Sequence, residues 1–95
     1  MSTASKVIFQ PALKELRIIL CQSSKSSQGI RDFISQHYVA LKKVNPNTPI
    51  LIRECSNVEP KIFARYDLGK EKKAVVTNEN SESILKRIKE FASSS

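Results

Sequence analysis

The apolar positions along the first half of the chain predict a strand, a helix and a second strand. Residues 16–21 form a short apolar run of strand length that includes β-branched side chains. Residues 30–44 instead place apolar side chains every three or four positions, the spacing of one helix face. Prolines at 46 and 49 end that helix, because proline lacks a backbone donor. Residues 49–53, which are apolar from 49 to 52, then favour a parallel strand buried on both faces.

The second half predicts a hairpin followed by a helix. Residues 62–66 and 74–76 flank a turn at 67–70, which favours two antiparallel strands. Apolar residues from 84 to 92 then follow a helical spacing, and Asn80 or Ser81 can cap that helix. The predicted order, β-α-β-β-β-α, is that of a thioredoxin-like α/β domain, whose four-stranded mixed sheet carries two main helices on its faces. We place this single domain at residues 14–92, after a flexible lead-in at 1–13 and before a frayed tail at 93–95.

The net charge indicates more about possible partners than the overall composition does. A chain of 95 residues supports one domain, and its formal net charge is +7, from 16 basic and 9 acidic residues. Such a balance suits an acidic protein, a phosphate backbone or an anionic lipid, although a solvated basic surface is the simpler alternative. No apolar run approaches the ~20 residues of a membrane span. The first acid is Glu15, so the N-terminus is compatible with an uncleaved mitochondrial address.

Two blocks of sequence resemble one known family. Residues 51–66 read LIRECSNVEPKIFARY, and residues 16–22 (LRIILCQ) precede residues 27–33 (SQGIRDF). Both resemble the small thioredoxin-like accessory subunit of mitochondrial NADH:ubiquinone oxidoreductase (complex I), whose domain is shared with certain mitochondrial ribosomal proteins. The likeness covers about residues 14–69.

This resemblance implies a role without catalysis. It predicts a subunit of the peripheral arm, on the matrix side of the mitochondrial inner membrane and near the NADH-oxidising module, that supports assembly and stability. Other subunits of that arm would be its partners, and it would have no cofactor, metal, nucleic acid or small-molecule substrate. The first alternative is a mitochondrial ribosomal protein that binds rRNA through its basic surface.

The two cysteines offer the clearest candidate chemistry. Cys21 and Cys55 end two strands that should be adjacent and parallel, about 4.8 Å apart, which is within disulfide reach. A bridge would stabilise the domain by about 2–4 kcal/mol, whereas intracellular redox conditions favour two reduced thiols. The family resemblance also implies a bridge at these two positions.

A thiol–disulfide oxidoreductase is the less favoured second alternative. Thioredoxin chemistry needs a Cys-x-x-Cys motif where the first helix begins, because the helix N-terminus lowers the pKa of the thiol. Residues 25–29 occupy that junction and contain no cysteine, so we assign no catalytic residue. His37 has no second ligand at a metal-binding spacing, and we expect it to face solvent or the margin of its helix.

The remaining candidates are structural or face a partner. Pro60 precedes the third strand, where thioredoxin-like folds hold a cis-proline, so the fold resemblance predicts a cis bond there. Arg31 opposes the dipole of its own helix and predicts a compensating group outside that helix, such as a carboxylate on a neighbour. Arginine and tyrosine are enriched at interface centres, although an intramolecular ion-pair and packing set along the sheet edge is the alternative. The partner-interface candidates are Arg53, Glu54, Arg65 and Tyr66.

Overall fold

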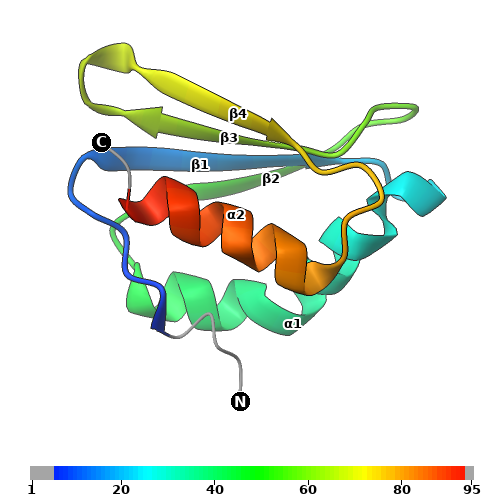
Figure 1. Ribbon diagram of the computed structural model, residues 1–95, viewed down its shortest axis with the longest axis horizontal. Coiled ribbons are helices and arrows are strands. Elements are labelled where there is room, and N and C mark those ends of the chain that lie inside the picture. Colours follow the sequence, from blue (N-terminus) through cyan, green and yellow to red (C-terminus); the bar gives the residue numbers. More distant parts are fainter. Residues whose placement is uncertain (1–5, 94–95) are drawn as a thin grey trace.

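A computed structural model describes residues 6–93 and has the predicted order of elements (Figure 1). This order confirms an α/β fold of the thioredoxin-like type, with a four-stranded mixed sheet and two α-helices. The parts of the expected lead-in and tail at residues 1–5 and 94–95 lie outside the described residues. The elements are β1 (Leu13–Leu20), a 3-10 turn η2 (Lys25–Ser27), α1 (Gln28–Val44), β2 (Ile50–Glu54), β3 (Lys61–Tyr66), a 3-10 turn η3 (Asp67–Gly69), β4 (Glu71–Val75) and α2 (Ser81–Ser93).

The sheet has the spatial order β2-β1-β3-β4. Strand β1 runs parallel to β2 and antiparallel to β3, and β4 completes the predicted hairpin with β3. At the centre of the register, Ile18 lies opposite Ile52 on one side and Ile62 on the other. Strand β2 is therefore an edge strand. Its predicted burial on both faces is wrong, because Leu51 and Ile52 are 36% and 37% exposed.

Both helices cover the same face of the sheet (Figure 1). Side chains of β1 alternate accordingly: Leu16 and Ile18 are fully buried, whereas Arg17 is only half-buried. In Figure 1 the sheet forms one layer and the two helices form a second layer beneath it. The sequence predicted helices on both faces, so this arrangement corrects it. Across the described residues, the second face of the sheet has no helix over it.

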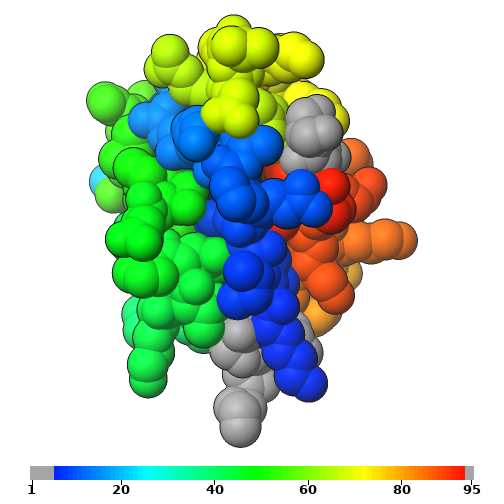
Figure 2. Space-filling model, turned by 90° about the vertical axis from the view of Figure 1, so that its left-hand side faces the viewer, coloured from blue at the N-terminus to red at the C-terminus, as the bar shows by residue number. Residues whose placement is uncertain are grey.

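The segment before β1 is packed rather than flexible. Val7 and Phe9 are buried, and the Gln10 N–H donates to the Ala92 carbonyl at 3.2 Å. Figure 2 shows this segment between the chain near residue 45 and the C-terminal helix. Residues 7–13 therefore belong to the domain, which corrects the predicted lead-in. The apolar residues of this segment follow neither a helical nor a strand spacing, so the sequence pattern did not predict their burial.

Close backbone contact joins the start of α1 to the loop before α2. A Cβ placed on Gly29 would overlap the carbonyl oxygen of Glu79, so only glycine allows the two segments to approach. The Asn80 side-chain Oδ1 accepts the Ser83 N–H at 2.8 Å, which confirms Asn80 as the cap of α2. The two helices thus begin at the same end of the domain, beneath the C-terminal end of β1.

Candidate functional site

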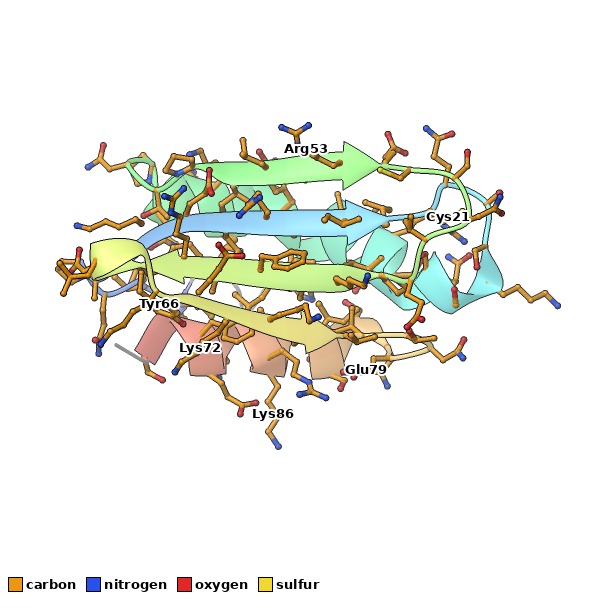
Figure 3. The ribbon with its side chains drawn as sticks, turned by 90° about the horizontal axis from the view of Figure 1, so that it is seen from above. Cys21, Arg53, Tyr66, Lys72, Glu79 and Lys86 are labelled. Carbon is orange, nitrogen blue, oxygen red and sulfur yellow. The ribbon has the colours of Figure 1, made fainter. Side chains whose placement is uncertain are left out.

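The uncovered face of the sheet presents a lattice of side chains that we call the open face. Strand register and alternation determine its members, and Figure 3 shows this face toward the viewer with the helices behind. Its first row is Arg53, Ile19, Lys61 and Val75; its second row is Leu51, Arg17, Phe63 and Lys73; its third row is Glu15, Arg65 and Glu71.

Arg17 organises the centre of the open face. Its guanidinium lies 3.3 Å from the Glu15 carboxylate and 3.5 Å from the Glu71 carboxylate. The same guanidinium stands over the Phe63 ring, with its central carbon 5.6 Å from the ring centroid. One arginine therefore engages both acids of this face and stacks on its aromatic ring.

The other four cations of the open face have no such partner. Within residues 6–93, no carboxylate lies within 4.0 Å of the charged atoms of Arg53, Lys61, Arg65 or Lys73. Arg53, Arg65 and Lys73 are exposed, and Lys61 is half-buried. The open face is therefore electropositive, and its exposed cations can bind an external anion.

The four partner-interface candidates from the sequence divide between the two faces. Arg53 and Arg65 lie on the open face, because they pair in register with Ile19 and Glu15. Glu54 pairs with Leu20 and shares the helix-covered side of the sheet, where it is exposed at the edge. Tyr66 also lies on the helix-covered side, because it pairs with Leu13.

Tyr66 is a core residue, which corrects its proposed place at an interface. Only 3% of it is exposed, and its hydroxyl donates to the Phe91 carbonyl at 2.8 Å. The Lys72 ammonium lies 5.4 Å from its ring centroid. The intramolecular alternative weighed for these residues therefore holds for Tyr66. Sequence reasoning missed the role of Arg17 and Phe63, although the period-2 alternation of Lys61, Phe63 and Arg65 was a usable signal.

The two cysteines meet at one end of the sheet, as predicted. The Cys55 N–H donates to the Leu20 carbonyl at 2.9 Å, so the parallel ladder continues up to both cysteines. Cys21 is buried and Cys55 is exposed, and both are free thiols, so the expected bridge is not present in this structure. They line a polar pocket of about 370 Å³ together with Gln22, Ser23, Glu54, Ser56 and Asn57.

Backbone donors surround the Cys21 sulfur. Hydrogen bonds from the backbone of Ser23, then of Asn57 and Ser24, lower the pKa of the Cys21 thiol from its ordinary value of 9.0 to about 7. The Cys21 N–H donates to the buried Ser27 hydroxyl at 3.1 Å, which fixes the end of β1 against the start of α1. Cys21 can therefore be a thiolate near neutral pH, although α1 offers no cysteine near its start as a second thiol.

Two further sequence expectations need correction, and a third is confirmed. The Glu59–Pro60 bond is trans, since the described chain has no cis peptide; the buried Pro60 instead anchors β3 by accepting the Val76 N–H at 3.0 Å. Arg31 is compensated from outside its helix, as expected, because its guanidinium donates to the Cys21 carbonyl oxygen at 2.8 Å. His37 is buried, with its Nε2 3.8 Å from the Glu82 carboxylate, because it packs between the two helices.

Comparison with known proteins gives one family and several close relatives. Residues 30–81 match the model of the mitochondrial ribosomal protein L51 / S25 / CI-B8 domain. The chain is 51% identical to NADH dehydrogenase [ubiquinone] 1 alpha subcomplex subunit 2 of Mus musculus, over 85% of this chain and 82% of the relative. The subunit of the same name in Arabidopsis thaliana is 46% identical over 87% and 86%. The NADH-ubiquinone oxidoreductase 10.5 kDa subunit of Neurospora crassa is 45% identical over 73% of each chain.

Proposed function

Because this chain belongs to the mitochondrial ribosomal protein L51 / S25 / CI-B8 domain family, we propose that it is a non-catalytic accessory subunit of mitochondrial complex I. The observation that carries the proposal is the 51% identity to a subunit of that enzyme, which extends over 82% of the relative. Plant and fungal relatives with the corresponding names support the same role.

The subunit would act as a structural part of the peripheral arm, on the matrix side of the inner membrane near the NADH-oxidising module. Supporting the assembly and stability of that arm requires a compact domain with a surface for a neighbour. The two-layer fold supplies this, because its helices fill one side of the sheet and leave the open face to a partner. Neither helix of residues 6–93 has the length and apolarity that crossing a bilayer requires.

The arrangement of thiols supports a role without dithiol catalysis. Cys21 and Cys55 end two different strands, and α1 begins at Gln28 after residues 25–27, which include no cysteine. A thioredoxin-type enzyme instead carries both thiols at the start of that helix, where the dipole activates the attacking sulfur. The low pKa of Cys21 arises here from backbone donors at a strand end.

The proposal is tested by following the protein in mitochondria. An epitope-tagged chain should co-migrate with NADH dehydrogenase activity on a native gel of solubilised mitochondrial membranes. Deleting the gene should lower the amount of assembled enzyme, and the tagged chain should restore it. A tagged chain that migrates free of that activity would contradict the proposal.

A mitochondrial ribosomal role is the second candidate. The electropositive open face favours it, and so does the family itself, which is named after mitochondrial ribosomal proteins. Sedimentation separates the two: a ribosomal protein would travel with rRNA and be released by moderate salt, since phosphate contacts weaken steeply as salt rises. Sedimentation with the NADH dehydrogenase band would instead support the accessory subunit.

A further inference from the structure

We propose that the open face is the docking surface of this subunit, and that its partner is an acidic surface on a neighbouring protein subunit of the same complex. The inference rests on the proposed function and adds to it the face that is used and the chemistry of what it meets. Three observations carry it: the uncovered sheet, the unpaired cations and the apolar side chains between them.

The open face carries more apolar surface than a solvated sheet face needs. Sheets with one wet face usually alternate apolar side chains inward and polar ones outward. Here Val75 is 41% exposed and Leu51 is 36% exposed, while Ile19 and Phe63 are half-buried by their neighbours alone. These four side chains lie in the first two rows of the lattice, so one flat partner surface can cover them together.

The charge of this face selects an acidic partner. Five cations against two acids leave this face with a net positive charge, and both acids lie in the third row, in contact with Arg17. Arg53 and Lys61 flank Ile19 in the first row, and Lys73 is next to Phe63 in the second. Carboxylates placed opposite these three side chains would be complementary to them, whereas a basic partner would be repelled.

The distribution of charge favours a protein over a phosphate-rich partner. Glu15 and Glu71 sit in the third row, at the end of the face near the β3–β4 turn, and would repel a continuous polyanion. The apolar residues between the cations also have no role on a phosphate backbone. A protein surface can instead place acids against the first two rows and apolar groups between them.

Charge reversal at two positions tests the surface. The double variant Arg53→Glu/Lys73→Glu changes the open face, and Lys86→Glu/Lys89→Glu makes the same change in net charge on exposed positions of α2. Each is expressed in mitochondria that lack the endogenous chain, and its share in the NADH dehydrogenase band is measured. The open-face variant should lose at least tenfold in incorporation, because its new carboxylates would face the carboxylates of the partner. The α2 control should stay within twofold, and both purified variants should melt within a few degrees of the wild type.

Zero-length cross-linking tests the chemistry of the partner. A carbodiimide joins a lysine amine to a carboxylate as an amide, and the water that is lost converts the reagent to its urea. In purified complex I, Lys61 or Lys73 should be linked to an aspartate or glutamate of another subunit. Replacing both with arginine should remove the link while incorporation continues.

The outcomes separate this inference from the proposed function. A wild-type chain absent from the NADH dehydrogenase band would overturn both. A wild-type chain that incorporates, with an open-face variant that incorporates equally or with cross-links only from Lys86 and Lys89, would overturn the docking surface alone. Binding of the purified wild type, but not of the open-face variant, to RNA or to vesicles with anionic phosphatidylserine, with no protein cross-link, would assign the face to phosphate and overturn the inference.

Discussion

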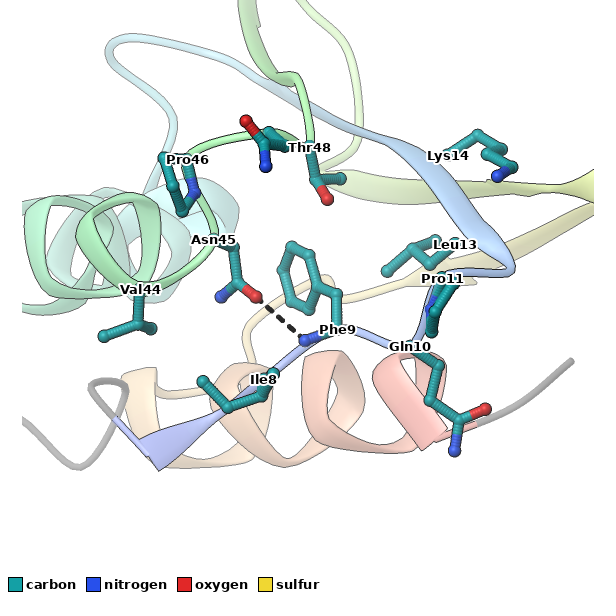
Figure 4. A pocket seen from close by; sticks show the side chains of 11 residues that line it. Ile8, Phe9, Gln10, Pro11, Leu13, Lys14, Val44, Asn45, Pro46 and Thr48 are labelled. Atoms are coloured by element: carbon teal, nitrogen blue, oxygen red, sulfur yellow. Dashed lines mark hydrogen bonds between the residues drawn. The ribbon is translucent and has the colours of Figure 1, made fainter.

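Asn45 holds the backbone of Phe9 from 36 positions away in the sequence, accepting its N–H on Oδ1 at 2.8 Å (Figure 4). The amide nitrogen of the same side chain donates to the carbonyls of Val7 at 2.8 Å and Leu41 at 3.0 Å. One buried side chain therefore connects the end of α1 to the segment that precedes β1. Burial makes each of these bonds costly to lose, because no water replaces the missing partner.

Replacing Asn45 with alanine should lower the free energy of unfolding by about 2–4 kcal/mol, from three bonds worth about 0.5–1.5 kcal/mol each. Urea denaturation followed by circular dichroism measures this change. The matched control is Asn47→Ala, an exposed position in the same loop, which should stay within about 0.5 kcal/mol of the wild type. Equal stability of the two variants would show that the N-terminal segment is not held in this way.

Gly29→Ala should destabilise the domain even though alanine favours helices more than glycine by about 1 kcal/mol. The added methyl group would overlap the Glu79 carbonyl oxygen, and that atom belongs to the backbone and cannot rotate away. We expect a net loss of about 1–3 kcal/mol in thermal or chemical unfolding. Ser35→Ala, at an exposed position of α1, serves as the control and should have little effect. A stabilised Gly29→Ala variant would mean that the two helix starts are farther apart than described.

The sequence predicted what local periodicity and chain connectivity determine. The helical spacing from Ile30 onward predicted α1, and the parallel β-α-β connection placed Cys21 next to Cys55. Connectivity does not determine which face of a sheet a helix covers, so the position of both helices on one side could not be read from spacing. The apolar side chains of β2 likewise predicted burial on both faces, because a strand's composition does not show whether it lies at the edge of the sheet.

Only part of the candidate site could be predicted from the sequence. Arg53 and Arg65 could be assigned to one face, and Glu54 to the other, by counting alternate positions along each strand. The environment of Cys21 could not be predicted, because the donors to its sulfur are backbone N–H groups, which every residue type except proline offers. Nor could the three bonds of Asn45, which link segments far apart in the chain.

Cys21 should titrate near pH 7 in the folded protein. A Cys55→Ala variant isolates this thiol, and thiolate absorbance at 240 nm should rise with a midpoint at about 7. The folded pKa lies below the ordinary value of 9.0, so the folded state favours the thiolate and gains stability from it as pH rises. That gain is complete above about pH 9 and is lost as pH falls through 7. The stability difference between Cys55→Ala and Cys21→Ala/Cys55→Ala should therefore grow from pH 7 to pH 9, and a constant difference would contradict the prediction.

The protein should not catalyse dithiol exchange despite this low pKa. Insulin reduction by dithiothreitol, followed as turbidity, should proceed at the same rate with the wild type and with Cys21→Ser. The reason is geometric, since Cys21 and Cys55 follow the ends of two strands and neither lies at the start of a helix. Turnover above background that disappears in the Cys21→Ser variant would reverse the assignment of a structural role.

Mild oxidation should join Cys21 to Cys55, because the Cys55 N–H bond to the Leu20 carbonyl sets the two strand ends side by side. The bridge closes a loop around α1 and should raise the free energy of unfolding by about 2–4 kcal/mol. Wild-type protein treated with diamide, with the loss of two hydrogens verified by mass spectrometry, should melt several degrees above the reduced form. The Cys21→Ser and Cys55→Ser variants lack one sulfur each, so the same treatment should leave their melting unchanged. If verified oxidised protein had the same melting temperature as the reduced form, strain at the strand ends would cancel the stabilisation from restricting the unfolded chain.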